Sequence, residues 1–109
     1  MPWQVVIHPE AEVELRALPR REEVAMLNAI DKLIATGTLL RFPHQSDVRG
    51  VQGLRELRPR QGRSPWRALY GQKNEVLIVV AIAPEAEMDH RGFERAIRRA
   101  TVRLAEAEV

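Results

Sequence analysis

The spacing of apolar residues in the first third of the chain predicts one strand and two helices. Residues 3–8 are rich in β-branched side chains and predict a strand that stops at Pro9. Residues 9–18 predict a short helix, because proline suits the first helical turn. Apolar residues recur at helical spacing over residues 21–36, which predicts a second helix capped by Gly37. Helices joined this closely are expected to form a hairpin.

The rest of the chain predicts a series of strands followed by one helix. Residues 37–50 have no periodicity and are expected to form a loop. The elements expected next are a strand at 51–58, a turn at 59–65, a strand at 66–72, a turn at 73–75 and a strand at 76–83. The last strand is apolar at nearly every position, as in a central strand covered on both faces. An amphipathic helix is expected over residues 89–108, with an apolar stripe of Phe93, Ile97, Ala100 and Leu104.

This order, β-α-α-β-β-β-α, indicates an α+β fold in a single domain over residues 1–109. We expect a small, mostly antiparallel sheet with the helical hairpin on one face and a C-terminal helix. The other face is expected to be open and concave, lined by the second to fourth strands. A site carried by strands would lie on that face.

Composition and charge narrow the classes of function. The chain has no cysteine, which excludes a disulfide scaffold, a thiol nucleophile and thiolate metal sites. Neither a signal peptide nor a membrane-spanning run is recognisable, so a cytoplasmic protein is expected. The net charge of +2 divides into −2 for residues 1–36, +5 for residues 37–83 and −1 for residues 84–109. A basic middle segment points to a nucleic-acid partner.

Most of this positive charge lies in the stretch Leu54–Tyr70, LRELRPRQGRSPWRALY, where Glu56 is the only acid. Its arginines are Arg55, Arg58, Arg60, Arg63 and Arg67. Guanidinium groups this close repel one another unless an anion lies among them, and their planar donors suit phosphate. We interpret the stretch as an arginine-lined site for RNA phosphate. A basic hairpin that is merely solvated is the alternative.

Four stretches of the chain resemble the RelE/HigB-type toxins of bacterial toxin–antitoxin modules, especially the phage-derived Gp49-like branch. They are the first strand followed by HPEAEVEL, the amphipathic helix ending in TG, GLRELRP followed by WRALY, and VLIVVAI. The resemblance implies a small RNase that enters the ribosomal A site and cleaves mRNA without a cofactor. It also implies neutralisation by a cognate antitoxin.

The resemblance implies a catalytic role for two arginines, but departures from the family pattern leave other functions open. Arg58 and Arg67 fall where such toxins keep arginines, and both are expected to stabilise the scissile phosphate. After the last strand, this branch usually has a Phe and a Lys-Lys pair, but the chain reads APEAEMDHRGF. The chain also lacks the C-terminal tyrosine of RelE. Two alternatives therefore stay open: a ParE-like inhibitor of DNA gyrase, and a degenerate domain that only binds antitoxin or RNA.

The remaining candidate residues follow from their chemistry. His90 is a candidate for proton transfer, although a surface histidine beside a capping Asp89 is an equal alternative. The side chains expected to bind the RNA backbone are Arg55, Arg60, Arg63, Trp66 and Lys73. Strand alternation places Tyr70 with Trp66 on the face opposite Arg67, so Tyr70 is expected to pack in the core. The three histidines are too widely spaced to indicate a metal site.

Overall fold

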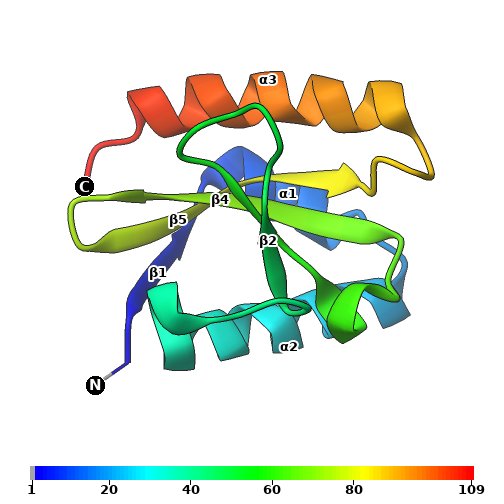
Figure 1. Cartoon of the computed structure of the whole chain (residues 1–109), viewed down its shortest axis with the longest axis horizontal. Helices are drawn as coiled ribbons and strands as arrows, with labels where there is room; N and C mark the ends of the chain where they lie inside the picture. Colours follow the sequence, from blue (N-terminus) through cyan, green and yellow to red (C-terminus); the bar gives the residue numbers. More distant parts are fainter. Residues whose placement is uncertain (1) are drawn as a thin grey trace.

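A five-stranded sheet lies between helices in the computed structural model, which describes residues 2–109 (Figure 1). The elements follow one another as β1 (Gln4–Ile7), α1 (Pro9–Arg16), α2 (Arg20–Thr36), the 3-10 helix η1 (Gly37–Leu39), β2 (Gln45–Asp47), β3 (Arg55–Leu57), the 3-10 helix η2 (Pro59–Gly62), β4 (Trp66–Lys73), β5 (Val76–Pro84) and α3 (His90–Glu106). The spatial order of the strands is β1-β5-β4-β3-β2. The predicted α+β fold and its helical hairpin are confirmed.

Two of the sequence predictions for the middle of the chain are wrong. The expected loop over residues 37–50 contains η1 and the short strand β2. The strand expected over residues 51–58 is only three residues long, because the chain before it turns back from β2. Both short strands depend on each other, since Gln45 pairs with Leu57 and Asp47 with Arg55. A strand of three residues is too short to show the alternation of apolar and polar side chains from which strands are predicted.

Three of the four strand pairs are antiparallel, and β1 runs parallel to β5. The mostly antiparallel sheet is therefore confirmed. A bulge interrupts the β4–β5 pair, where Leu69 faces Ala81 and Tyr70 faces Val79, so that Val80 is the extra residue. Tyr70 is buried in the core, as strand alternation predicts.

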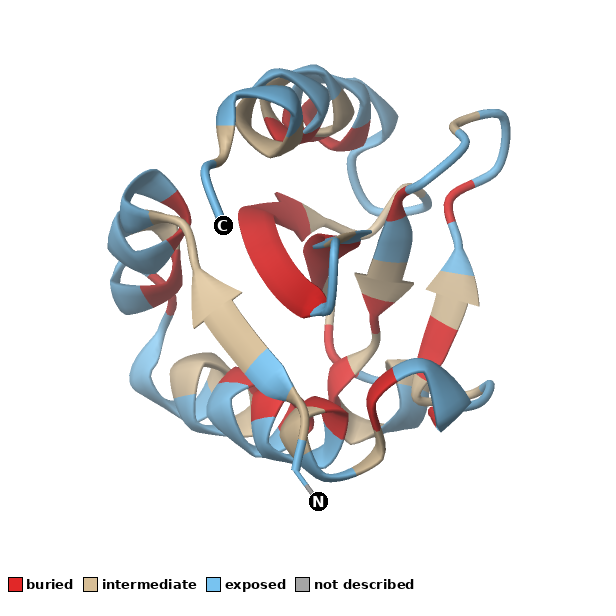
Figure 2. Ribbon diagram, turned by 90° about the vertical axis from the view of Figure 1, so that its left-hand side faces the viewer, coloured by how far each residue is buried: buried red, intermediate tan, exposed pale blue. Residues whose placement is uncertain are grey.

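Apolar cores fill the space on both faces of β4 and β5. On one face, Leu33 of α2 and Leu15 of α1 pack with Tyr70 and Val79. On the other, α3 covers the sheet and its Phe93 packs in a second cluster. Figure 2 shows the two buried central strands, in red, enclosed in this way. The expectation of an open face is therefore wrong for β4 and β5, because β5 is apolar on both faces and both must be covered.

Along the second half of β5, where β1 no longer pairs with it, side chains make hydrogen bonds to the free backbone groups. Strand β1 stops at Ile7, which faces Val79, and the backbone of residues 80–84 has no strand on that side. There, the Ile82 N–H donates to Glu14 Oε1 at 3.0 Å, and Arg99 Nη2 donates to the Ile82 carbonyl at 3.3 Å. Arg103 Nη1 donates to the Val80 carbonyl at 2.9 Å. Arg103 also binds both Glu14 oxygens, so α1 and α3 are tied together across this edge.

We expect Glu14 to make the stability of the protein depend on pH. Burial by itself would raise the pKa of Glu14, but hydrogen bonds from Arg103 and the Ile82 N–H, with the charge of Arg99, lower it below 4.5. A carboxyl with a lowered pKa stabilises the fold above its unfolded pKa, and this stabilisation is lost as the pH falls through the folded value. The free energy of unfolding should therefore fall on acidification below about pH 4.5.

Urea unfolding of wild type and Glu14→Gln between about pH 7 and pH 3 checks this. Glu14→Gln should lose about 1–3 kcal/mol at neutral pH and show a shallower acid decline. Glu12→Gln is the matched control, because Glu12 makes only an exposed ion pair with Arg16. Parallel pH curves for wild type and Glu14→Gln would contradict the prediction.

Candidate functional site

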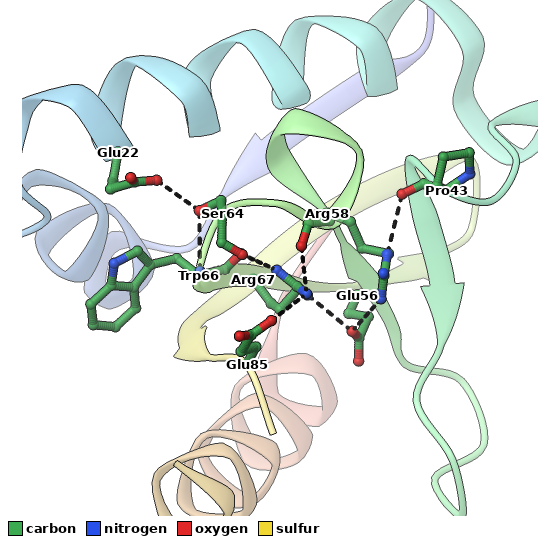
Figure 3. Close-up of polar contacts among 9 residues, drawn as sticks. Glu22, Pro43, Glu56, Arg58, Ser64, Trp66, Arg67 and Glu85 are labelled. Carbon is green, nitrogen blue, oxygen red and sulfur yellow. Dashed lines mark hydrogen bonds and ion pairs between the residues drawn. The ribbon is translucent and has the colours of Figure 1, made fainter. Parts of the chain in front are cut away.

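Arg67, near the start of β4, is buried and has a hydrogen-bond partner for each of its nitrogens. Its side chain is 4% exposed. Nε donates to Glu56 Oε1 at 3.3 Å and Nη2 to Glu85 Oε2 at 2.8 Å. The other acceptors are the backbone carbonyls of Gly62, Ser64 and Trp66. Figure 3 shows Arg67 between Ser64, Glu56 and Glu85. The predicted direct contact of Arg67 with phosphate is not supported, because the interior already occupies its donors.

Arg58, at the end of β3, lies beside Arg67 and shares its carboxylate. Nη1 of Arg58 is 3.5 Å from Glu56 Oε1, the same oxygen that accepts from Arg67. Arg58 Nε donates to the Pro43 carbonyl at 3.2 Å (Figure 3), and the guanidinium carbon is 5.1 Å from the Phe42 ring centroid. The structure thus brings the two predicted arginines together around Glu56. Arg58 is the more accessible of the two, with a side chain that is 21% exposed.

The turn between β3 and β4 is held by an acid from a distant helix. Arg60 Nη2 contacts both Glu22 oxygens, at 3.1 and 2.8 Å, and Ser64 Oγ donates to Glu22 at 2.8 Å. Burial would raise the pKa of Glu22, but these hydrogen bonds outweigh it and lower the pKa. Arg60 and Gln61 both have left-handed φ angles, of 53° and 59°, which side-chain-bearing residues adopt only with support. Glu22 supports this turn through Arg60 and Ser64, and Arg67 supports it through the carbonyls of Gly62 and Ser64.

The other predicted RNA-binding side chains are spread over the molecule. Lys73 binds the C-terminus of α3, where Nζ donates to three carbonyls, those of Leu104, Ala105 and Ala107. This contact corrects its assignment, because cations at a helix C-terminus satisfy its free carbonyls. Trp66 is half-buried against the core. Arg55 lies beside Asp47 and Gln45 on β2, and Arg63 is exposed and donates to the Arg60 carbonyl.

His90 stands apart from the arginines at the first turn of α3. Its side chain is 72% exposed, and Nε2 is 2.8 Å from Glu94 on the same helix. Asp89 caps the helix by accepting from the Gly92 N–H at 2.9 Å. Within residues 2–109, no hydrogen bond or ion pair joins His90 to Arg58 or Arg67. The alternative of a surface histidine beside a capping aspartate describes this geometry.

A pocket of about 300 Å³ opens on the other side of Arg58, between α2 and the β3–η2 segment. We call it the basic pocket. Its polar lining residues are Arg21, Asn28, Lys32, His44, Arg58 and Arg60, and its apolar ones are Val24, Ala25, Ala29, Leu40 and Leu57. No aspartate or glutamate belongs to this lining. The positive charge of the arginine-rich stretch is therefore accessible here, beside α2, and at the exposed Arg55 and Arg63.

The sequence profile of the family described as "Phage derived protein Gp49-like" matches residues 13–85. The match spans more than half of the chain, from α1 to the segment that follows β5. The chain belongs to the Gp49-like family. The family predicted from the sequence motifs is confirmed.

Solved toxins share the fold of this Gp49-like chain at low sequence identity. A mutant of the E. coli toxin RelE in the free state has a TM-score of 0.63 and 17% identity, and the match covers 91% of this chain and 98% of that one. RelE in the archaeal RelE–RelB complex of Pyrococcus horikoshii has a TM-score of 0.56 and 23% identity, with coverages of 77% and 96%. A chain of the toxin–antitoxin complex RelBE2 of Mycobacterium tuberculosis has a TM-score of 0.52 and 24% identity, and the match covers 79% of this chain and 94% of that one. The predicted RelE-like architecture is confirmed, and no curated protein matches the chain.

Two acids of the Gp49-like site were missed by sequence reasoning. Glu22 lies on α2, far from the arginines in sequence, and nothing around it signals the contact with Arg60. Glu85 could have been found, because the APEAEMDHRGF segment contains acids but no lysine. An acid there folds back onto Arg67 and neutralises it.

None of the helices within residues 2–109 combines the length and the apolar character needed to cross a bilayer. Over the same residues, no three histidine or acidic side chains gather as ligands for a metal ion.

Proposed function

We propose that this chain is the toxin of a toxin–antitoxin module and that it inhibits translation by cutting ribosome-bound mRNA. The observation that carries the proposal is Arg58, a partly exposed arginine at the rim of the basic pocket, within a Gp49-like chain that has the RelE fold. Arg58, Arg60 and Arg63 contact the RNA backbone, and Arg58 stabilises the scissile phosphate. Arg67 acts as a positioning residue, because it holds Glu56 and the β3–β4 turn.

The proposal includes a protein partner, because such a toxin must be held inactive until it is needed. Two of the similar structures are complexes of a toxin with its antitoxin. We infer that a cognate antitoxin binds this chain as well. The ribosome and its mRNA are the targets, and no cofactor is required, because fixed cations supply the electrostatic stabilisation of the cleavage step.

Expression in bacteria tests the nuclease directly. Wild type should stop growth and create new mRNA 5′ ends within translated frames. Arg58→Gln should reduce this cleavage by about 10²-fold, because it removes a cation aimed at the developing charge. Arg16→Gln is the control, since it removes the same charge from an exposed ion pair on α1. Loss of DNA supercoiling with intact mRNA would overturn the proposal in favour of a gyrase inhibitor.

One specific observation favours a second candidate, a toxin-like domain that binds RNA or antitoxin without cutting. Arg67 is neutralised by Glu56 and by Glu85, which lies in the lysine-free APEAEMDHRGF segment after the last strand. If this neutralisation prevents catalysis, wild type should leave mRNA intact, and Glu85→Gln should produce cleavage by removing one of the two negative charges that neutralise Arg67. Cleavage by wild type that Glu85→Gln leaves unchanged would instead support the nuclease with Arg67 as a positioning residue only.

A further inference from the structure

A second and larger pocket, of about 750 Å³, lies beside the loop that joins β2 to β3. We call it the loop pocket. It is lined by Thr38 of η1, residues 47–55, residues 70–72 of β4 and Leu77 of β5. The loop pocket and the basic pocket, as residues 2–109 form them, share no lining residue. Small-molecule sites have volumes of about 300–1,000 Å³, so the loop pocket is large enough for a small ligand.

One row of side chains across the sheet contributes to the wall of the loop pocket. Asp47 faces Arg55 across the β2–β3 pair, and Arg55 faces Tyr70 across the β3–β4 pair. Residues directly opposite each other in antiparallel strands point to the same face of the sheet. The row lies on the α2 face, because Tyr70 packs in the same core cluster as Leu33 of α2. Arg67 is three positions before Tyr70 on β4 and therefore points to the other face, so the loop pocket is separate from the site around Arg67.

The hydroxyl group of Tyr70 has no partner in the part of the chain that the structure describes. Tyr70 is only 3% exposed, yet its hydroxyl makes no hydrogen bond with any of residues 2–109. Among those residues, Arg99 Nε is the only fully buried side-chain nitrogen or oxygen without a hydrogen bond, so the Tyr70 hydroxyl must touch open space. The loop pocket, which Tyr70 lines, provides that space. Because nearly all buried polar groups are hydrogen-bonded, this free hydroxyl favours a ligand with a polar atom in the pocket.

At neutral pH the Tyr70 hydroxyl is a hydrogen-bond donor. Burial raises the pKa of Tyr70 to about 12, against the opposing charge of Arg55, and the charge of Asp47 adds to the rise. The phenol therefore stays protonated and can donate to a carbonyl oxygen or a ring nitrogen of a ligand. Because both charges act on the hydroxyl, Arg55 and Asp47 lie close to it.

Two arginines give the loop pocket a net positive charge. Arg49 is exposed and makes no ion pair or hydrogen bond within residues 2–109. Arg55 has a side chain that is 48% exposed, and its Nη1 lies 3.5 Å from Asp47 Oδ1. Asp47 is the only acid among the described lining residues, so one of the two positive charges is not compensated. Guanidinium groups offer planar pairs of donors that match the oxygens of a phosphate.

The remaining lining suits the base and the sugar of a nucleotide. Val48, Leu54 and Leu77 are buried aliphatic residues of the pocket. The amide of Gln52 offers both a donor and an acceptor, as the edge of a nucleobase requires. Strands β2 and β4 are two strand spacings apart, about 10 Å, which is a distance that a nucleoside monophosphate can bridge.

We propose that the loop pocket binds a nucleoside 5′-monophosphate. The base packs on the aliphatic side chains and accepts a hydrogen bond from the Tyr70 hydroxyl, and the phosphate binds Arg49 and Arg55. This assigns Arg55 to a small ligand on the α2 face of the sheet. The proposal does not rest on the proposed nuclease, whose residues lie outside the loop pocket. Because the ligand binds only the folded protein, it should also raise the midpoint of unfolding.

Calorimetric titration of the full chain tests this proposal. The probes are the four common nucleoside 5′-monophosphates, and the controls are the matching nucleosides and inorganic phosphate. At least one monophosphate should bind about 10-fold more tightly than its nucleoside and than phosphate, because the pocket contacts both parts of the ligand. Tyr70 is the only tyrosine of the chain. Protein with ¹³C-labelled tyrosine therefore gives one set of ring NMR signals, and these should shift when the monophosphate binds.

Two variants distinguish the two ends of the bound ligand. Tyr70→Phe removes only the hydroxyl, and the variant should fold normally because that group has no partner within residues 2–109. It should weaken the binding of monophosphate and nucleoside alike, by about 5-fold. Arg49→Gln should weaken the monophosphate by about 10-fold and leave the nucleoside unchanged. Arg91→Gln is the control, because it removes the same charge from an exposed position on α3, across the sheet from α2 (Figure 1).

Three results would overturn the proposal. The first is that none of the four monophosphates binds at millimolar concentration. The second is that inorganic phosphate binds as tightly as the monophosphates, which would mean that the pocket holds only an anion. The third is that Tyr70→Phe and Arg49→Gln both bind the monophosphate like wild type, which would place the ligand elsewhere. None of these results bears on mRNA cleavage, which the Arg58→Gln experiment measures separately.

Discussion

Replacing Arg67 by methionine should cost about 3–5 kcal/mol of unfolding free energy, the largest loss expected from any single change in this site. Methionine keeps much of the volume of arginine but none of its donors. The Glu56 and Glu85 carboxylates would lose their main partner, and three backbone carbonyls would lose theirs. Small domains are stable by only about 5–15 kcal/mol, so the variant should be close to unfolding.

Urea unfolding of purified protein measures this loss. Arg63→Met is the matched control, because Arg63 is exposed in the same turn, and it should change stability by less than about 0.5 kcal/mol. Arg67→Lys should fall between wild type and Arg67→Met, since lysine keeps the charge but cannot reproduce the planar geometry of the donors. A wild-type midpoint for Arg67→Met would contradict the structural role. Loss of toxicity in an Arg67 variant therefore indicates catalysis only if the variant is folded.

Gly37→Ala should be the second most damaging substitution, with a loss of about 2–4 kcal/mol. Gly37 ends α2 with φ 59° and ψ −133°, a combination that residues other than glycine adopt only under strain. An added Cβ would also lie 2.2 Å from ring atoms of Trp3, which packs against the core. Strain and overpacking therefore act together at this position.

Thermal and urea unfolding of Gly37→Ala check the prediction against a second glycine. Gly50 also has a positive φ, of 79°, but an added Cβ there would meet nothing within 4 Å. Gly50→Ala should consequently show the backbone strain alone, about 1 kcal/mol. Similar losses in the two variants would mean that the contact with Trp3 adds nothing.

The elements with a strong apolar pattern could be predicted from the sequence, because local chemistry determines them. β5 is apolar throughout and lies inside the sheet, between β1 and β4, and Tyr70 is buried as the alternation of β4 requires. β2 could not be predicted, since its three residues form a strand only by pairing with β3. The apolar stripe of α3 was predicted correctly, but the sequence did not show that this stripe covers the second face of the sheet. The apolar character of both faces of β5 was the available clue.

The candidate site was predicted less well than the fold, for an electrostatic reason. The arginine-rich stretch contains one acid, which suggested that the arginines await an external anion. The fold instead provides Glu22 from α2 and Glu85 from the segment after β5, and these acids neutralise Arg60 and Arg67. Charge counted along a short segment cannot include partners that only the tertiary structure supplies. The exposed Arg55 and Arg63 and the partly exposed Arg58 remain the accessible part of the predicted site.

The side chains bonded to the second half of β5 also limit where a strand of another molecule can pair with this sheet. Edge strands with free N–H and C=O groups invite a strand from another molecule and promote aggregation. At Val80 and Ile82 these groups are already bonded to Glu14, Arg99 and Arg103, so an incoming strand would have to displace two helices. Any association by strand addition is thereby directed to β1 or β2, the outermost strands of the sheet.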